Sequence, residues 1–164
     1  VDWRRERLTP DSVSSGVAYA DDTHGRDNTG LYALSQFQQG VWQAELSGRT
    51  DDNDQYGRHN TWQSGAGWTF LTDYRLSGRY GTGFRAPSFN DLYFPDAYTP
   101  GNPDLQPEES KNRELMLDGV TKMVIWRVTG YRNDIEQMIQ WAPDSSGLWR
   151  PENVGQAQIG RAHV

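Results

Sequence analysis

Three stretches of the chain alternate between apolar and polar residues, and this period of two constrains the fold more than any other feature. The stretches are 41–50, 61–70 and 74–85. In the first of them, Trp42 and Leu46 fall on one face, whereas Gln43 and Glu45 fall on the other. An α-helix turns once in about 3.6 residues and would scatter these side chains around its circumference. The alternation therefore predicts three β-strands, each with one apolar and one polar face.

Five further stretches alternate less regularly, and they are 1–8, 29–38, 109–120, 123–140 and 149–160. Within 123–140 the pattern fades at Asn133 and Asp134, which indicates a β-bulge or the point where a strand leaves a membrane. No stretch has the pattern of a long amphipathic helix, and no run of about 18 apolar residues predicts a transmembrane helix. We therefore expect an all-β protein.

The connections between these strands alternate in length along the chain. Short connections lie at 39–40, 72–73 and 119–122, and long polar ones at 9–28, 51–60, 86–108 and 141–150. Outer-membrane β-barrels have this asymmetry, with tight turns on one side of the membrane and long loops on the other. A soluble meander has short connections throughout, of about four to six residues. The sequence thus predicts about eight strands of an antiparallel up-and-down transmembrane β-barrel, which form an open curved sheet in isolation.

Only 35% of the residues are hydrophobic, yet 12% are aromatic. This composition suits a sheet with lipid on one face and water on the other. A soluble β-sheet binding module has a similar composition and remains the alternative. In a barrel the apolar face points outward, whereas in a soluble module it packs against a second layer; its residues are Trp42, Leu46, Trp62, Trp68 and Phe84. The net charge of −6 provides no basic field for nucleic acid, and without cysteine the chain has no disulfide or cysteine-based zinc site.

Two motifs bracket the connection 86–108. Residues 80–93 read YGTGFRAPSFNDLY, and residues 101–110 read GNPDLQPEES. Pro87 cannot donate to a strand ladder, and a Gly-Asn-Pro sequence at 101–103 is typical of a turn. In this order the motifs resemble those of the TonB-dependent outer-membrane receptors, where a strand ends in the first motif and the next begins with the second. The resemblance implies a barrel of about 22 strands around an N-terminal plug, and a TonB-energised transporter rather than an enzyme.

Other segments are similar to the family members that import vitamin B12 (cobalamin), namely 1–3, 51–53, 56–59, 61–63, 67–68, 130–135 and 152–157. The resemblance implies cobalamin as the ligand, and TonB (through the plug) and outer-membrane lipid as partners. It places the protein in the outer membrane of a Gram-negative bacterium. The family's calcium sites lie in other loops, so no cofactor or metal ligand is expected in this chain. The loop 92–100 is longer than in those members, which leaves a siderophore or haem receptor as an alternative.

The candidate ligand contacts are three rings of the connection 86–108, namely Tyr93, Phe94 and Tyr98. A ring with a polar tip suits a large amphipathic ligand, and the alternative is that these rings pack the loop against its neighbours. Three apolar residues around the connection 141–150 are expected to lie in an aromatic belt at a membrane interface, and they are Trp141, Leu148 and Trp149. No arrangement of Ser, His and Asp predicts catalysis.

The charged clusters have plainer interpretations than a metal site. The run 51–54 lacks the spacing of a calcium loop, because Tyr56 stands at a ligand position, and we expect a solvated loop tip. A second exposed acidic cluster is expected from Asp21, Asp22, His24 and Asp27. Arg75, Arg79 and Arg85 share one face and are expected to pair with the plug or to line a hydrated lumen.

The chain is expected to be a piece of a longer protein, because Val1-Asp2-Trp3 begins directly in a strand-like segment. Residues 1–158 are assigned to the barrel. Residues 159–164 read Ile-Gly-Arg-Ala-His-Val, which is the translation of a widely used short-read sequencing adapter in one reading frame. We therefore hypothesise that 159–164 come from the adapter rather than from the gene.

Overall fold

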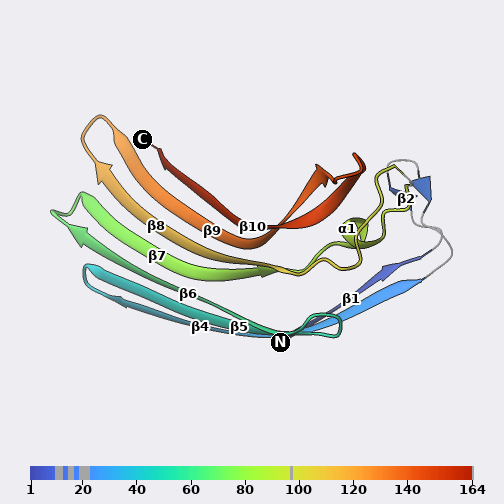
Figure 1. Cartoon of the computed structure of the whole chain (residues 1–164). Coiled ribbons are helices and arrows are strands. Elements are labelled where there is room, and N and C mark those ends of the chain that lie inside the picture. Colours follow the sequence, from blue (N-terminus) through green and yellow to red (C-terminus); the bar gives the residue numbers. More distant parts are fainter. Residues whose placement is uncertain (10–12, 15–16, 19–22, 97, 164) are drawn as a thin grey trace.

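Eight strands form one antiparallel sheet in a computed structural model that describes residues 1–9, 13–14, 17–18, 23–96 and 98–163. The strands are β1 (Asp2–Leu8), β4 (His24–Gln39), β5 (Trp42–Asn53), β6 (Gly57–Phe70), β7 (Tyr74–Arg85), β8 (Glu108–Val120), β9 (Ile125–Pro143) and β10 (Trp149–His163). Each strand of the sheet pairs with the next one along the chain. A separate small hairpin consists of β2 (Val13–Ser14) and β3 (Val17–Ala18). Figure 1 shows the sheet as a curved trough.

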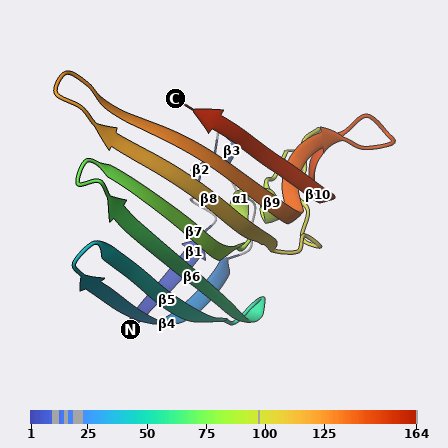
Figure 2. The ribbon, with the colours of Figure 1, turned by 90° about the vertical axis from the view of Figure 1, so that its left-hand side faces the viewer.

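All eight predicted strands are confirmed, and so is the all-β antiparallel architecture. Short turns at 40–41, 71–73 and 121–124 join neighbouring strands at one end of the sheet. The long connection 86–107 and the small β2–β3 hairpin lie at the opposite end (Figure 1), and Figure 2 shows strands β4 to β10 side by side in chain order. The two ends of the sheet therefore differ in the way the sequence predicts for a barrel wall.

Two of the predicted long connections are wrong. Strands β5 and β6 stay paired as far as Asn53 and Gly57, so that only a tight turn remains of the predicted loop 51–60. The predicted loop 141–150 likewise shrinks to residues 144–148. Polar composition predicts a loop poorly here, because an antiparallel ladder pairs backbone groups and continues through polar side chains.

The predicted bulge is misplaced. The β8–β9 ladder is regular through Asn133 and Asp134. The irregular residue is Gln137, which has a φ of 56° and is skipped in the β9–β10 register. The side-chain amide of Asn153 donates to the carbonyl oxygen of Gln137 at 2.7 Å, which satisfies the group that the ladder leaves out.

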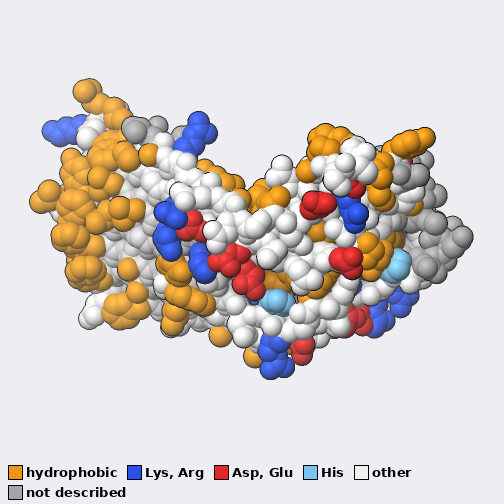
Figure 3. Space-filling view, viewed as in Figure 1, with side chains coloured by type: hydrophobic (Ala, Val, Ile, Leu, Met, Phe, Trp, Pro, Cys, Tyr) orange, Lys and Arg blue, Asp and Glu red, His pale blue; other side chains and the backbone are white. Residues whose placement is uncertain are grey.

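The register aligns the apolar faces of neighbouring strands. Trp42 lies opposite Trp68, and Trp68 lies opposite Leu76. Ring contacts with centroids 5.0 to 6.1 Å apart cross four strands near the short turns, through Trp42, Trp68, Phe70, Tyr74 and Trp126. Hydrophobic side chains gather at that end of the molecule in Figure 3.

No second layer covers this apolar face within the part of the chain that the structure describes. Trp42 and Leu46 are 56% and 58% exposed, and Trp62 and Trp68 are 45% and 41% exposed. These values contradict the soluble module, in which the same residues would be buried. Phe84 is the exception, because it stacks on His59 with ring centroids 3.7 Å apart and lines a cavity together with Arg49. The register places Phe84 on the same face as Tyr80, so its predicted outward orientation stays a prediction.

The opposite, concave face is polar. A cavity of about 380 Å³ follows it across the sheet, and its lining includes Gln36, Gln43, Glu45, Arg75, Arg79, Asp118 and Arg127. Arg75 donates through Nη2 to Oε1 of Gln43 at 2.5 Å, so strands β5 and β7 of the wall are linked by polar side chains. Such a surface suits the hydrated interior of a barrel.

The buried apolar core lies under the connection 86–107 rather than within the sheet. Leu92, Leu105 and Ile139 form it, with Phe89 and Tyr93 packed against them. In the described residues, the longest helix is α1 (Phe89–Tyr93), and no helix is long and apolar enough to cross a membrane. The core therefore fixes the loop in place, and the loop is the natural place to look for a site.

Candidate functional site

The first half of the loop is ordered by a helix cap. Ser88 caps α1, and its Oγ accepts a hydrogen bond from the backbone N of Asp91 at 3.2 Å. The carboxylate of Asp91 accepts in return from the backbone N of Ser88 at 3.0 Å. This reciprocal capping box explains why the sequence turns sharply into a helix directly after Pro87.

Asp91 also joins the loop to two strands of the wall. Its Oδ1 accepts from Nε1 of Trp141 in β9 at 3.1 Å, and its Oδ2 lies 3.7 Å from Nη2 of Arg85 in β7. Arg85 also reaches Glu108 in β8, with 3.5 Å between Nη1 and Oε2. A single buried carboxylate thus connects the helix, the preceding strand and a strand two positions away in the sheet.

A second anchor comes from β4. Arg26 is 8% exposed, and its Nη1 donates to the carbonyl oxygen of Pro87 at 2.8 Å. Its guanidinium also lies over the ring of Phe89, 5.2 Å from the centroid, and forms an ion pair with Glu6 of β1. Because a buried charge without partners is costly, this set of contacts holds the loop firmly against the first strands of the segment.

The second motif returns the chain under α1. A Cβ on Gly101 would stand 2.5 Å from the backbone N of Phe94, so only glycine allows this approach. The backbone N of Asn102 donates to the carbonyl oxygen of Asp91 at 2.8 Å, and its side-chain amide donates to that of Pro151 at 2.9 Å. Leu105 is 2% exposed and completes the core. The two sequence motifs therefore form one structural unit.

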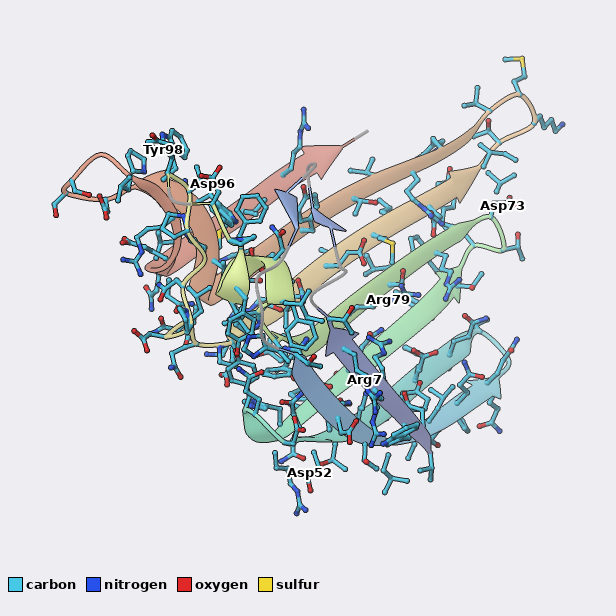
Figure 4. All side chains as sticks on the ribbon, turned by 90° about the vertical axis from the view of Figure 1, so that its right-hand side faces the viewer. Arg7, Asp52, Asp73, Arg79, Asp96 and Tyr98 are labelled. Atoms are coloured by element: carbon cyan, nitrogen blue, oxygen red, sulfur yellow. The ribbon has the colours of Figure 1, made fainter. Side chains whose placement is uncertain are left out.

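The three predicted ligand contacts lie in this unit but differ in surroundings. Tyr93 stacks on His24, with centroids 3.7 Å apart, and Phe94 meets Trp141 edge to face at 6.1 Å. Tyr98 is 79% exposed. Figure 4 shows Tyr98 beside Asp96 at the loop end of the sheet, with Asp73 at the far end. Of the three rings, Tyr98 is thus the one most available to a ligand, and ligand contact stays a prediction for all three.

Several residues that the sequence interpretation assigned elsewhere belong to this unit. Trp141 packs against Phe94 and bonds Asp91, so its predicted place in a membrane belt is wrong. Trp149 is 52% exposed. Arg26 and His24 carry no motif, and only the pairing of β1 with β4 brings them beside the loop. Their place beside the loop could be predicted from the sequence only if the β1–β4 register were known.

The acidic run 51–54 is solvated only in part, because Asp52 and Asp54 are exposed whereas Asp51 and Asn53 are packed. Asp51 accepts from Arg49 at 2.6 Å and from Asn28 at 2.7 Å, and Asn53 is 5% exposed. Beyond it, burial raises the pKa of Tyr56 to about 12, and in the described part of the chain its hydroxyl has no hydrogen-bond partner. One side of the hairpin tip is therefore packed, through Asp51, Asn53 and Tyr56, and the other side is exposed.

No group of three His, Cys, Asp or Glu side chains could hold a metal ion among residues 1–9, 23–96 and 98–162. Of the second predicted acidic cluster, Asp21 and Asp22 lie outside the described residues. Asp27 forms a bidentate pair with Arg5 at 2.7 and 2.8 Å. The predicted pairing of Arg75 and Arg79 with a plug stays a prediction.

The sheet is apolar on its outer face and polar on its inner face, and a loop is docked at one end. This arrangement is that of a segment of a transmembrane β-barrel wall. A family model described as TonB dependent receptor-like, beta-barrel, matches residues 1–159. The chain therefore belongs to the family of TonB-dependent receptors.

Among curated relatives, the chain is 47% identical over 164 aligned residues to the vitamin B12 transporter BtuB of Photobacterium profundum. The match covers 97% of this chain and 25% of that protein, so the chain spans about a quarter of its length.

Two solved structures have a similar fold. One is the siderophore receptor PirA from Pseudomonas aeruginosa, with a TM-score of 0.75 and 19% identity over 85% of this chain and 28% of that chain. The other is a mutant ferric enterobactin receptor, PfeA from Pseudomonas aeruginosa, in complex with enterobactin. Its TM-score is 0.77, with 16% identity over 98% of this chain and 29% of that chain. At these identities the likeness concerns the fold alone.

Proposed function

We propose that the chain is part of the wall and rim of an outer-membrane receptor that binds cobalamin and imports it with energy supplied through TonB. The supporting observation is the 47% identity to a vitamin B12 transporter along 97% of the chain. The proposed location is the outer membrane of a Gram-negative bacterium. No bond of the ligand is made or broken in such transport, so the chain contributes binding and enclosure rather than catalysis.

We propose separate tasks for the parts of the segment, and the geometry supports them. The outward rings face lipid, and the polar concave face borders the lumen through which a ligand would pass. The loop 86–107 is anchored to β4, β7 and β9, and in this proposal its tip lies at the mouth of the complete barrel. A pre-ordered tip lowers the entropy that ligand binding must overcome. We propose that the tip contacts the ligand chiefly through Tyr98, with Tyr93 and Phe94 beneath it.

The test uses a chimeric receptor in which residues 1–158 replace the matching quarter of the Photobacterium profundum transporter. Radiolabelled cobalamin should bind cells that carry this chimeric receptor, and unlabelled cobalamin should compete, whereas ferric enterobactin should not. Competition by ferric enterobactin instead would favour the siderophore alternative. A well-folded chimeric receptor that binds neither ligand would contradict the cobalamin proposal.

The ring contacts are tested by replacement in the same chimeric receptor. Tyr98→Ala should weaken cobalamin binding by about tenfold, the effect of losing one good aromatic contact of about 1.4 kcal/mol. Tyr74→Ala is the matched control, because Tyr74 belongs to the ring contacts near the short turns, at the other end of the sheet. Equal affinities of the two variants per folded receptor would exclude Tyr98 as a ligand contact.

A further inference from the structure

Strand β9 is interrupted at Gln137, on the side of both of its neighbours. The β8–β9 ladder ends where Glu109 pairs with Glu136, one residue before it. In the β9–β10 ladder, Gln137 and Gly155 are the two residues left out. Gln137 has a φ of 56°, which is a costly left-handed conformation for a residue with a side chain. The row at Gln137 therefore separates the wall from the end of the β9–β10 hairpin, residues 138–154, which we call the outer hairpin.

The outer hairpin contacts the wall and the loop 86–107 through side chains. The backbone N of Ile139 donates to Oε1 of Glu108 in β8 at 2.7 Å, and Nε1 of Trp141 donates to Asp91 of the loop at 3.1 Å. The part of β9 in the outer hairpin bends away from the line of the strand (Figure 2). Because the β8–β9 ladder has already ended, the outer hairpin can separate from the wall without breaking a backbone ladder.

One side chain joins the outer hairpin, the loop and the interrupted row. The amide of Asn153 in β10 donates through Nδ2 to the carbonyl oxygen of Gln106 at 2.8 Å, and its Oδ1 accepts from the backbone N of Gln106 at 2.7 Å. The same Nδ2 donates to the carbonyl oxygen of Gln137 at 2.7 Å. Asn153 thus binds both backbone groups of the loop residue, as a neighbouring strand would, and the carbonyl group of the left-handed residue as well.

These contacts allow two arrangements of the same residues. In the structure, the hydrogen bonds of Asn153 compensate for the cost of the left-handed conformation of Gln137. Once Asn153 releases Gln106, Gln137 can return to an extended conformation, and the two registers then place it opposite Glu108 of β8 and Gly155 of β10. Its carbonyl oxygen then has a backbone group or water as its partner, so neither arrangement leaves a buried group unpaired.

We propose that the outer hairpin is a lid that holds the loop 86–107 against the wall, with Gln137 as its hinge and Asn153 as the residue that keeps it closed. The hinge absorbs the change in φ. Opening separates Trp141 from Asp91 and releases the return segment of the loop. Because the tip of the loop carries Tyr98, the lid sets whether a ligand meets an ordered surface. The inference goes beyond the proposed function, because it does not depend on the identity of the ligand.

The experiment measures hydrogen exchange at the amide of Ile139 in the folded, detergent-purified chimeric receptor without ligand. The bond from this amide to Glu108 crosses from the lid to the wall and does not involve Asn153. Gln137→Gly should slow the exchange about fivefold, because glycine adopts a positive φ without cost and is unfavourable in an extended strand. Gln140→Gly is the matched control, since Gln140 pairs regularly, and it should speed the exchange. Unchanged or faster exchange in Gln137→Gly would overturn the hinge.

The role of Asn153 is tested by Asn153→Asp, which keeps the size of the side chain and removes both donated bonds. The exchange at Ile139 should become about 30-fold faster, and adding Gln137→Gly should slow it again about fivefold. Asn112→Asp is the matched control, because Asn112 is exposed on β8 and the change of charge is the same. Equal exchange in the two aspartate variants, or no rescue by Gln137→Gly, would overturn the role of Asn153. Failure of cobalamin binding would count only against the proposed function.

Discussion

Replacing Gly101 by alanine is expected to undock the loop 86–107 from the barrel wall. A Cβ at this position would stand 2.5 Å from the backbone N of Phe94 and 2.6 Å from backbone atoms of Leu92 and Tyr93. Ordinary contact begins at 3.4 Å, so the chain must move apart by about 0.9 Å. The obstructing atoms are backbone, and rotation of a side chain cannot relieve the clash.

The movement would break the two backbone hydrogen bonds that join the returning chain to α1. They run from Gly101 N to Phe94 O at 3.0 Å and from Asn102 N to Asp91 O at 2.8 Å. Each contributes about 1 kcal/mol net, so the docked state should lose about 2 kcal/mol, or roughly 30-fold in its equilibrium constant.

Hydrogen exchange of the chimeric receptor measures this loss directly. Amides of residues 89–105 should exchange about 30-fold faster in Gly101→Ala, because local opening limits their exchange. Gly48→Ala is the matched control, since nothing lies within 4 Å of a Cβ there. An acceleration below about threefold in Gly101→Ala would refute the steric reasoning.

Further predictions concern the wall, the loop, the hairpin tip and the last residues. Leu46→Arg should lower the yield of folded receptor through a cost of about 2–4 kcal/mol in lipid, whereas Glu45→Arg on the polar face should not. Heat-modifiable mobility on gels reports both, and equal yields would contradict the assigned faces. Trp141→Phe removes the donor to Asp91 and should lower the local stability of α1 by about 1 kcal/mol, seen as faster hydrogen exchange; unchanged exchange would show that the bond contributes nothing. The buried Tyr56 favours its neutral form, with its pKa raised from 10.0 to about 12, so the stability it contributes is present below pH 10 and lost between about pH 10 and 12. Alkaline unfolding should therefore become shallower in that window in Tyr56→Phe, and an identical profile would argue against the shift. Sequencing the source locus tests the adapter hypothesis, which native DNA encoding Arg161–Val164 would contradict.

Strands were the most predictable part of the fold, because a helix does not place alternate residues on one face. Trp42, Leu46 and Trp68 are on the side that alternation assigned to them, and the register then aligned them across strands. Strand ends were less predictable. Residues 51–53 look like a loop by composition, yet Asp51 is bonded to Arg49 and Asn28, and the ladder continues through it. The bond from Asn28 joins residues 23 positions apart, and a bond of this kind leaves no local trace in sequence.

The site was predictable only as far as local motifs reach. The capping role of Ser88 and the turn at Gly101 follow from their own neighbours in sequence. Trp141 was assigned to a lipid-facing belt because an aromatic residue near a strand end usually lies there. Its partner Asp91 is 50 residues away, and only the packing of the loop onto β9 reveals the hydrogen bond.

The residues of this loop that identify the family differ from the residue proposed to bind the ligand. Ser88, Asp91, Gly101 and Leu105 are engaged in capping, turning and packing, so any receptor with a loop docked in this way could use them whatever its ligand. Tyr98 differs from these residues, because it is 79% exposed and does not hold the docked loop in place. The motifs therefore identify the class of receptor, and exchange of residues 95–100 between receptors should change ligand preference while hydrogen-exchange protection at Leu92 and Leu105 stays the same.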